Sequence, residues 1–240
     1  MARALRDKEI AMAVILTEGI VRDIIHGNPS RIVQVFVSSP LIWGIHVAAE
    51  SDFEEIIDLR GTSAAISRYG SGSHLMAFVN AENHDWDLKK DLFFEEIKDL
   101  DGALEGLPKG TGDYFMWEKF MTKPYVDNGT LRLIGESPTP WPSFVIVCRN
   151  EVLQENPAEI QTVLEVINEI TIGFKDIHRI AEIIAARYGQ EVPDVQEWLK
   201  LTNWSQYQLD DKTLEKVQDQ LLKLDLIQNK LPSDELLHNL

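Results

Sequence analysis

Cysteine is almost absent from this chain, since Cys148 is the only one among its 240 residues. A single cysteine cannot close an intramolecular disulfide and cannot supply a cysteine-rich metal site. Because Cys148 lies within the apolar run SFVIVCRN, we expect it to be a small buried side chain. The six histidines are scattered and form no HExxH-type pair, so the sequence predicts no metal site and no cofactor.

Positive charge and long apolar runs are also scarce. Lys and Arg number 23 against 39 Asp and Glu, which gives a formal net charge of −16 at pH 7. An acidic surface repels nucleic-acid phosphate and anionic lipid, so we expect neither as a partner. No run approaches the roughly 18 apolar residues of a membrane span, and AMAVIL is too short for a secretory signal. We therefore expect no membrane insertion and, for the chain as written, a cytoplasmic protein.

Strand-like and helix-like segments alternate in the first part of the chain. Predicted strands, apolar or rich in β-branched residues, cover 10–16, 31–38, 41–49, 62–67, 92–97, 113–117, 131–135 and 143–148. Predicted helices cover 20–25, 53–59, 100–107 and a segment from Ser73, and after Pro157 they cover 160–174, 177–188, 195–199 and 214–226. Alternating strands and helices followed by a helical tail indicate an α/β fold with largely parallel sheets.

The stretch SRYGSGSH, residues 67–74, lies between a predicted strand and a predicted helix. In open parallel α/β sheets, ligands bind beyond the carboxyl ends of the strands. Gly70 and Gly72 would let the backbone approach a ligand, and Ser71, Ser73 and the amides of the helix start would favour an anion. Arg68 would add a charge-assisted contact. A plain turn with Ser73 as the helix cap explains the same residues equally well.

Two further polar clusters follow predicted strands. Thr17 and Glu18 come after AMAVIL, and Trp117 and Glu118 come after DYFM. Trp141 lies between two prolines, which would hold its ring rigidly. Each has a structural alternative: burial in the core for the tryptophans and solvated carboxylates for the glutamates. For His74, a structural role at the start of the helix is the alternative to ligand binding.

The order of the segments ALRDKEIAMAVILTEG, DLRGTSAAISRYGSGSH, GTGDYFMWEKF and SFVIVCRNEVL resembles the type II periplasmic-binding-protein fold. The most similar branch contains binding proteins for nitrate, sulfonates, taurine and thiamine-pyrimidine precursors, and within it a little-characterised subgroup with TEG and SRYGSGSH. The resemblance implies two lobes, residues 1–45 with 143–240 and residues 46–142, which close over a ligand. It also implies the ligand-binding residues: Thr17, Glu18, Ser67, Arg68, Tyr69, Gly70, Ser71, Gly72, Ser73, His74 and Trp117, with Ser39 and Thr139 near the hinges. To these we add Glu118 and Trp141 as candidate ligand-binding residues from the clusters described above.

The chain departs from this family at its first residues. It begins in the tail of a helix, so the first lobe would lack the usual opening strand and helix. A missing interior strand would leave two unpaired edges and an open apolar slot in the sheet. We therefore expect weak stability or a homodimer across that edge. If residues are missing at the N-terminus, a periplasmic location replaces the cytoplasmic one.

The sequence leaves two main function classes open. The first is a non-catalytic solute-binding protein that works with an ABC permease and binds a sulfonate, a small carboxylate or a pyrimidine-like ring. The second is an enzyme of the thiamine-pyrimidine or menaquinone-precursor type, with Glu18 or His74 as acid or base. The thiamine-pyrimidine enzymes carry a cysteine-rich stretch, which a chain with only Cys148 cannot supply. A regulatory effector-binding domain is a weaker third reading, and the acidity argues against direct DNA contact.

Overall fold

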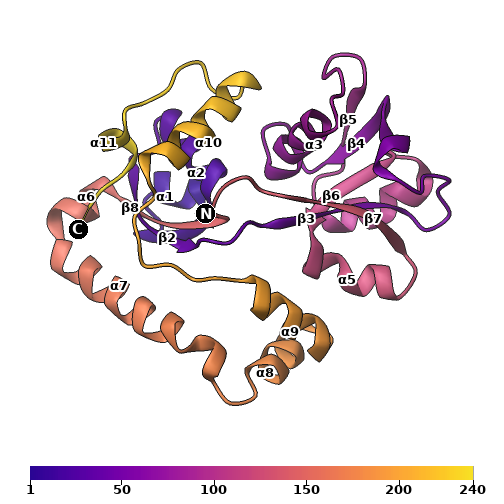
Figure 1. Cartoon of the computed structure of the whole chain (residues 1–240). Coiled ribbons are helices and arrows are strands. Elements are labelled where there is room, and N and C mark those ends of the chain that lie inside the picture. Colours follow the sequence, from indigo (N-terminus) through magenta and orange to yellow (C-terminus); the bar gives the residue numbers. More distant parts are fainter. Residues whose placement is uncertain (240) are drawn as a thin grey trace. The chain divides into compact units, whose positions relative to one another are not determined.

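The computed structural model describes residues 1–239, which form two compact units (Figure 1). Unit 1 contains Met1–Pro40 and the chain from Pro140 onward, and unit 2 contains Leu41–Thr139. The boundary predicted after Ile45 would cut through strand β3 (Ile42–Ala48), which belongs wholly to unit 2.

Unit 1 is built on a three-stranded sheet in the order β1-β8-β2. Its strands are β1 (Met12–Leu16), β8 (Phe144–Arg149) and β2 (Ser30–Val37). Both pairings are antiparallel, so the prediction of largely parallel sheets is wrong here. The physical reason is that β8 belongs to the chain returning from unit 2, and it runs against both neighbours.

The predicted open slot in this sheet is also wrong. β8 fills the position between β1 and β2, and the three strands form one continuous sheet. Within residues 1–239, pairing stops at the outer edge of β1, which has no neighbouring strand.

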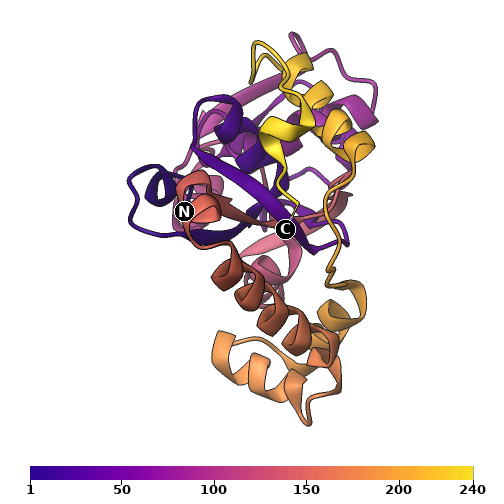
Figure 2. The same ribbon diagram turned by 90° about the vertical axis from the view of Figure 1, so that its left-hand side faces the viewer.

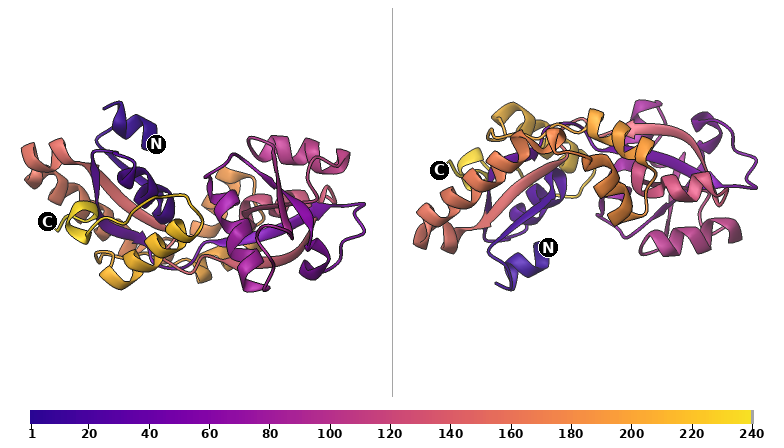
Figure 3. Two further views of the ribbon diagram at one scale, coloured as in Figure 1. Left: turned by 90° about the horizontal axis from the view of Figure 1, so that it is seen from above. Right: turned by 90° about the horizontal axis from the view of Figure 1, so that it is seen from below.

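Helices make up most of the rest of unit 1. They are α1 (Ala2–Arg6), α2 (Thr17–Ile25), α6 (Asn150–Glu155), α7 (Pro157–Ile172), α8 (Ile180–Tyr188), α9 (Val192–Leu201), α10 (Asp211–Lys223) and α11 (Ser233–Leu236), with a 3₁₀ turn, η3 (Phe174–Asp176). α7 starts at Pro157 after Asn156, as predicted for a first-turn proline. It packs Ile160 and Leu164 onto the sheet beside Cys148, whose predicted burial is confirmed. α8 and α9 lie beyond the C-terminal end of α7 (Figure 2), and α1 projects from the unit (Figure 3).

Unit 2 contains a five-stranded sheet in the order β5-β4-β6-β3-β7. Besides β3, its strands are β4 (Thr62–Ile66), β5 (Leu92–Glu96), β6 (Tyr114–Glu118) and β7 (Leu131–Pro138). β4 runs parallel to β5 and β6, whereas β3 runs antiparallel to β6 and β7. Parallel pairing therefore occurs between β4 and its two neighbours, β5 and β6. A ligand site beyond the carboxyl ends of parallel strands is expected at these strands.

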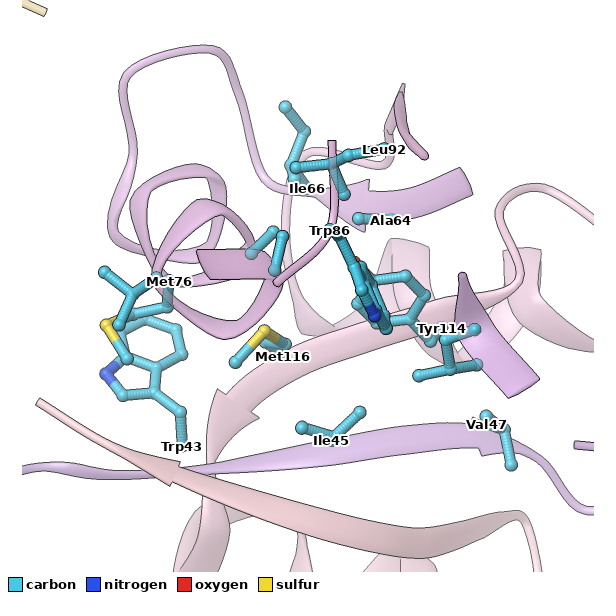
Figure 4. Close-up of a cluster of buried hydrophobic side chains, with 14 residues drawn as sticks. Trp43, Ile45, Val47, Ala64, Ile66, Met76, Trp86, Leu92, Tyr114 and Met116 are labelled. Atoms are coloured by element: carbon cyan, nitrogen blue, oxygen red, sulfur yellow. The ribbon is translucent and has the colours of Figure 1, made fainter. Parts of the chain in front are cut away.

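The helical elements of unit 2 are α3 (Gly72–Asn83), α4 (Leu100–Gly106), α5 (Lys119–Asp127) and two 3₁₀ turns, η1 (Ile56–Leu59) and η2 (Leu107–Lys109). α3 packs onto the sheet, and Figure 4 shows Met76 beside Trp43 in this core. The sequence did not predict α5, which contains Pro124, a residue that normally interrupts helices. Among residues 1–239, no helix is both long and apolar enough to cross a membrane.

Candidate functional site

The SRYGSGSH stretch forms the turn from β4 into α3 in unit 2. β4 ends at Ile66, and Ser71 is the N-cap of α3, with its hydroxyl accepting the N–H of His74 at 3.4 Å. The prediction that Ser73 caps the helix is therefore wrong, because the cap lies two residues earlier and Ser73 is already within the helix. Gly70 has a φ of +74°, a left-handed conformation that glycine adopts without a steric penalty.

Three buried hydroxyls hold this turn closed. The backbone N–H of Ser67 donates to Ser73 Oγ at 3.0 Å, and Ser73 Oγ lies 3.1 Å from Ser71 Oγ and 3.3 Å from Ser67 Oγ. The hydroxyls are thus used within the turn. The amides of Gly72 and Ser73, in the first turn of α3, have no hydrogen-bond partner within the described chain. They are the groups left for an anion.

His74 is buried and contacts the turn through a hydrogen bond and ring packing. Its Nδ1 accepts the N–H of Gly70 at 3.0 Å. Its ring packs edge-on against Tyr69, Phe78 and Phe94, with centroid distances of 5.3, 4.9 and 4.6 Å. These contacts support the structural role at the start of the helix that the sequence left open for His74.

Two exposed side chains stand at the same turn. Tyr69 is 63% exposed, and Arg68 is exposed and forms no ion pair within residues 1–239. Arg68 thus offers an exposed guanidinium in the same turn that carries the free amides of α3.

In unit 1, the corresponding turn joins β1 to α2. α2 begins at Thr17 immediately after β1, three residues before the helix predicted from residue 20, so residues 17–19 form its first turn. Leu16 occupies the cap position and offers no side-chain hydrogen bond. The hydroxyl of Thr17 donates to the carbonyl of Pro142 at 2.6 Å, which joins this turn to the returning chain.

Glu18 has an unusual environment at this helix start. Its side chain is 2% exposed, and its Oε2 accepts the indole N–H of Trp141 at 2.9 Å. Its Oε1 is buried without a hydrogen-bond partner within residues 1–239. Burial raises the pKa of Glu18, while its own backbone amide and Trp141 act in the opposite direction. Trp141 is itself buried and fills part of the core. Its hydrogen bond also orients the Glu18 carboxyl group.

Ser39 and Thr139, the two residues expected near the hinges, each form hydrogen bonds within their own unit. In unit 1, Ser39 Oγ accepts the N–H of Asn203 at 3.0 Å, and its carbonyl accepts the N–H and the hydroxyl of Ser143 at 3.2 and 2.9 Å. In unit 2, Thr139 Oγ1 accepts the N–H of Leu41 at 3.0 Å, and its own N–H donates to the carbonyl of Leu41 at 2.9 Å. Sequence reasoning missed Asn203, which no local motif marks.

Trp117 and Glu118 lie at the end of β6 in unit 2. Trp117 stacks on Phe115 with a centroid distance of 5.2 Å and meets Trp43 edge-on at 6.5 Å. Glu118 caps α5 by accepting the N–H of Met121 at 2.8 Å, and burial raises its pKa. Both residues thus have partners inside unit 2, and Glu118 is a partly buried carboxylate that caps a helix.

The structure divides the predicted site residues into two groups. Because β4 and β6 are parallel neighbours, with Ala65 paired to Phe115, their carboxyl ends lie at one edge of the sheet. That edge of unit 2 carries Ser67, Arg68, Tyr69, Gly70, Ser71, Gly72, Ser73, His74, Trp117 and Glu118. Unit 1 brings together Thr17, Glu18 and Trp141.

Comparison with known proteins identifies the fold. Residues 43–137 match the family model described as Ca3427-like periplasmic binding proteins. The Candida albicans CA3427 gene product, described as having the generic periplasmic-binding-protein fold, superposes with a TM-score of 0.85. The two sequences are 26% identical, and the match covers 95% of this chain and 78% of that one.

Two more distant structures show the same fold. The alkanesulfonate-binding protein SsuA from Xanthomonas axonopodis pv. citri, bound to MOPS, has a TM-score of 0.82 at 16% identity, covering 100% of this chain and 84% of that one. The ligand-binding component of an ABC-type import system from Staphylococcus aureus has a TM-score of 0.78 at 12% identity, covering 99% and 81%. No curated protein matches the chain. The chain therefore has the two-lobe α/β periplasmic-binding-protein fold.

Proposed function

We propose that this protein is a non-catalytic binding protein for a small anionic or strongly polar solute. The observation that carries the proposal is the start of α3. There the amides of Gly72 and Ser73 have no partner within the described chain, and Arg68 of the same turn is exposed. In a chain with a net charge of −16, these donors form a local site for negative charge.

A sulfonate or a small carboxylate is the ligand class that fits these donors best. Both present oxygens that accept backbone N–H groups and a guanidinium at the same time. SsuA from Xanthomonas, which shares the fold, is described as an alkanesulfonate-binding protein. None of the relatives named above is described as binding a pyrimidine, so we prefer the acid classes.

An ABC permease is the transport partner that we propose. The support is the Staphylococcus aureus structure, described as the ligand-binding component of an ABC-type import system.

Catalysis by Glu18 or His74 has weaker support. A nucleophile needs a base within hydrogen-bond reach. The serine hydroxyls of the α3 turn bond to one another, and His74 Nδ1 accepts the backbone N–H of Gly70. Glu18 is held by Trp141 in a buried position. These contacts favour binding over chemistry.

The test is ligand-induced thermal stabilisation with methanesulfonate, MOPS and acetate as probes, in a phosphate-free and sulfonate-free buffer. A ligand that binds only the folded state raises the melting temperature by mass action. We expect at least one acid to do so, and Arg68→Ala to weaken its binding by about tenfold or more. Arg60→Ala is the matched control, because Arg60 of unit 2 pairs with Asp91 at 2.8 Å, away from the α3 turn.

The proposal is wrong if no acid stabilises the protein, or if Arg68→Ala and Arg60→Ala bind the acid equally well. Mass spectrometry of the recovered acid completes the experiment. A chemically changed acid would favour the enzyme.

A further inference from the structure

The turn that leads into α3 carries an exposed aromatic side chain, Tyr69. Its ring is 63% exposed, although it belongs to the same short turn as the amides of Gly72 and Ser73. Those amides have no partner within the described chain. A ligand whose acid group binds there has a further part, and Tyr69 is the large side chain in the turn that is open to it.

The ring of Tyr69 is held in place in spite of its exposure. It meets the ring of His74 edge-on with a centroid distance of 5.3 Å, and the ring of Phe94 edge-on at 6.2 Å. The His74 and Phe94 rings also contact each other at 4.6 Å, and Phe94 packs on the core of unit 2. By contrast, Tyr207 of unit 1 is 81% exposed and has no ring contact within residues 1–239. A side chain that is already fixed loses little entropy when a ligand packs on it.

The contact with His74 places the Tyr69 ring at the start of the helix. Side chains of an α-helix lean toward its N-terminus, and His74 lies in the first turn of α3. Its Nδ1 accepts the N–H of Gly70, which precedes the helix. The His74 ring is therefore directed toward the helix start. Because the Tyr69 ring packs on it, Tyr69 lies at the same end of α3 as the amides of Gly72 and Ser73.

We propose that the ligand of this site is an aromatic acid, an aryl sulfonate or an aryl carboxylate. This inference rests on the proposed function, because it describes the body of the solute whose acid group binds the α3 amides. The acid oxygens accept the N–H groups of Gly72 and Ser73, and the aromatic ring of the ligand packs on the exposed side of Tyr69. Pairs of aromatic rings attract each other beyond the effect of the area they bury. An aromatic ring therefore binds Tyr69 better than an alkyl chain does.

The test is isothermal titration calorimetry of the full chain with three sulfonates, in a phosphate-free and sulfonate-free buffer. Methanesulfonate supplies the acid group alone. Hexane-1-sulfonate and benzenesulfonate add the same number of carbon atoms, as a chain and as an aromatic ring. We expect benzenesulfonate to bind about tenfold more tightly than methanesulfonate and more tightly than hexane-1-sulfonate.

Variants of Tyr69 identify the source of this preference. In Tyr69→Ala we expect the ratio of the benzenesulfonate and methanesulfonate affinities to fall to about one, whereas Tyr69→Phe keeps the ring and should keep the ratio. Phe93→Ala is the matched control, because Phe93 is 49% exposed and neighbours Phe94 on β5. Successive side chains of a strand point to opposite faces, so Phe93 lies on the other face of the sheet from Phe94. We expect the ratio in Phe93→Ala to equal that of the wild type.

Two sets of results overturn the inference in different ways. If benzenesulfonate binds no more tightly than the other two sulfonates, or if its preference survives Tyr69→Ala, the ring does not bind on Tyr69. The proposed function would then still stand, because methanesulfonate binding tests the amides alone. If none of the three sulfonates binds, the proposed function fails, and the inference fails with it.

Discussion

The indole N–H of Trp141 donates a hydrogen bond to Glu18 Oε2 at 2.9 Å, across 123 residues of sequence. The pair connects the first turn of α2 with the chain that returns from unit 2. Both side chains are buried, and Trp141 provides the one hydrogen bond to the Glu18 carboxyl from another residue recorded in unit 1. Unit 1 therefore depends on this contact to place a carboxyl group at the start of a helix.

Trp141→Phe should lower the free energy of unfolding by about 1–3 kcal/mol beyond the loss of ring size, because it strips a buried carboxyl of its donor. Trp86→Phe is the matched control, since the Trp86 indole N–H is buried without a partner among residues 1–239 and its removal strands no acceptor there. Urea denaturation of both variants measures the difference. Equal losses would show that the bond to Glu18 contributes nothing.

A second prediction concerns His46, which is fully buried in unit 2. Its Nε2 lies 2.8 Å from Thr122 Oγ1, and burial lowers its pKa from 6.5 to about 4. The unfolded chain thus takes up a proton at a higher pH than the folded chain. With respect to His46, the free energy of unfolding is highest above pH 6.5. It decreases as the pH falls from 6.5 to about 4, and the total decrease is about 3 kcal/mol.

Unfolding by urea at a series of pH values measures this slope, with His46→Gln as the variant that removes it. Glu18 acts in the opposite direction, because its raised pKa costs stability as the pH rises above 4.5. The comparison should therefore be repeated in a Glu18→Gln background. His178→Gln, at an exposed position, is the control. An unchanged slope in His46→Gln would contradict the assignment.

A third prediction separates backbone strain from crowding at the glycines of unit 2. Gly112 and Gly110 have φ angles of +78° and +77°. A Cβ at Gly112 would lie 2.9 Å from the Cβ of Ala65 in β4, whereas a Cβ at Gly110 would meet nothing within 4 Å. Both alanine variants carry the cost of the left-handed conformation, of about 1 kcal/mol, and only Gly112→Ala adds a clash.

Thermal unfolding should rank Gly112→Ala below Gly110→Ala, and Gly110→Ala below wild type. Equal melting temperatures for the two variants would mean that β4 shifts to accommodate the added carbon.

The sequence predicted most elements but not how the strands pair. The buried runs of β1, β2 and β8 look alike whether they pair parallel or antiparallel, because the alternation of side chains is the same in both. The antiparallel direction comes from the return of β8, a long-range feature. Helix α5 was missed because Pro124 resembles a helix breaker.

The candidate site was predicted best where its residues are contiguous. SRYGSGSH forms a strand-to-helix turn, and the error at its cap amounts to a shift from Ser73 to Ser71. The partners of Glu18 and Ser39 could not be predicted, because Trp141 and Asn203 are 123 and 164 residues away. Local patterns carry no information about such contacts.

The central claim is that the start of α3 binds the acid group of a ligand. Titration of ¹⁵N-labelled protein with methanesulfonate tests it directly, because each backbone amide is observed separately. We expect the amides of Gly72 and Ser73 to show the largest and saturable shifts, and Arg68→Ala to weaken them. Shifts that saturate elsewhere while these two amides stay unchanged would contradict the account.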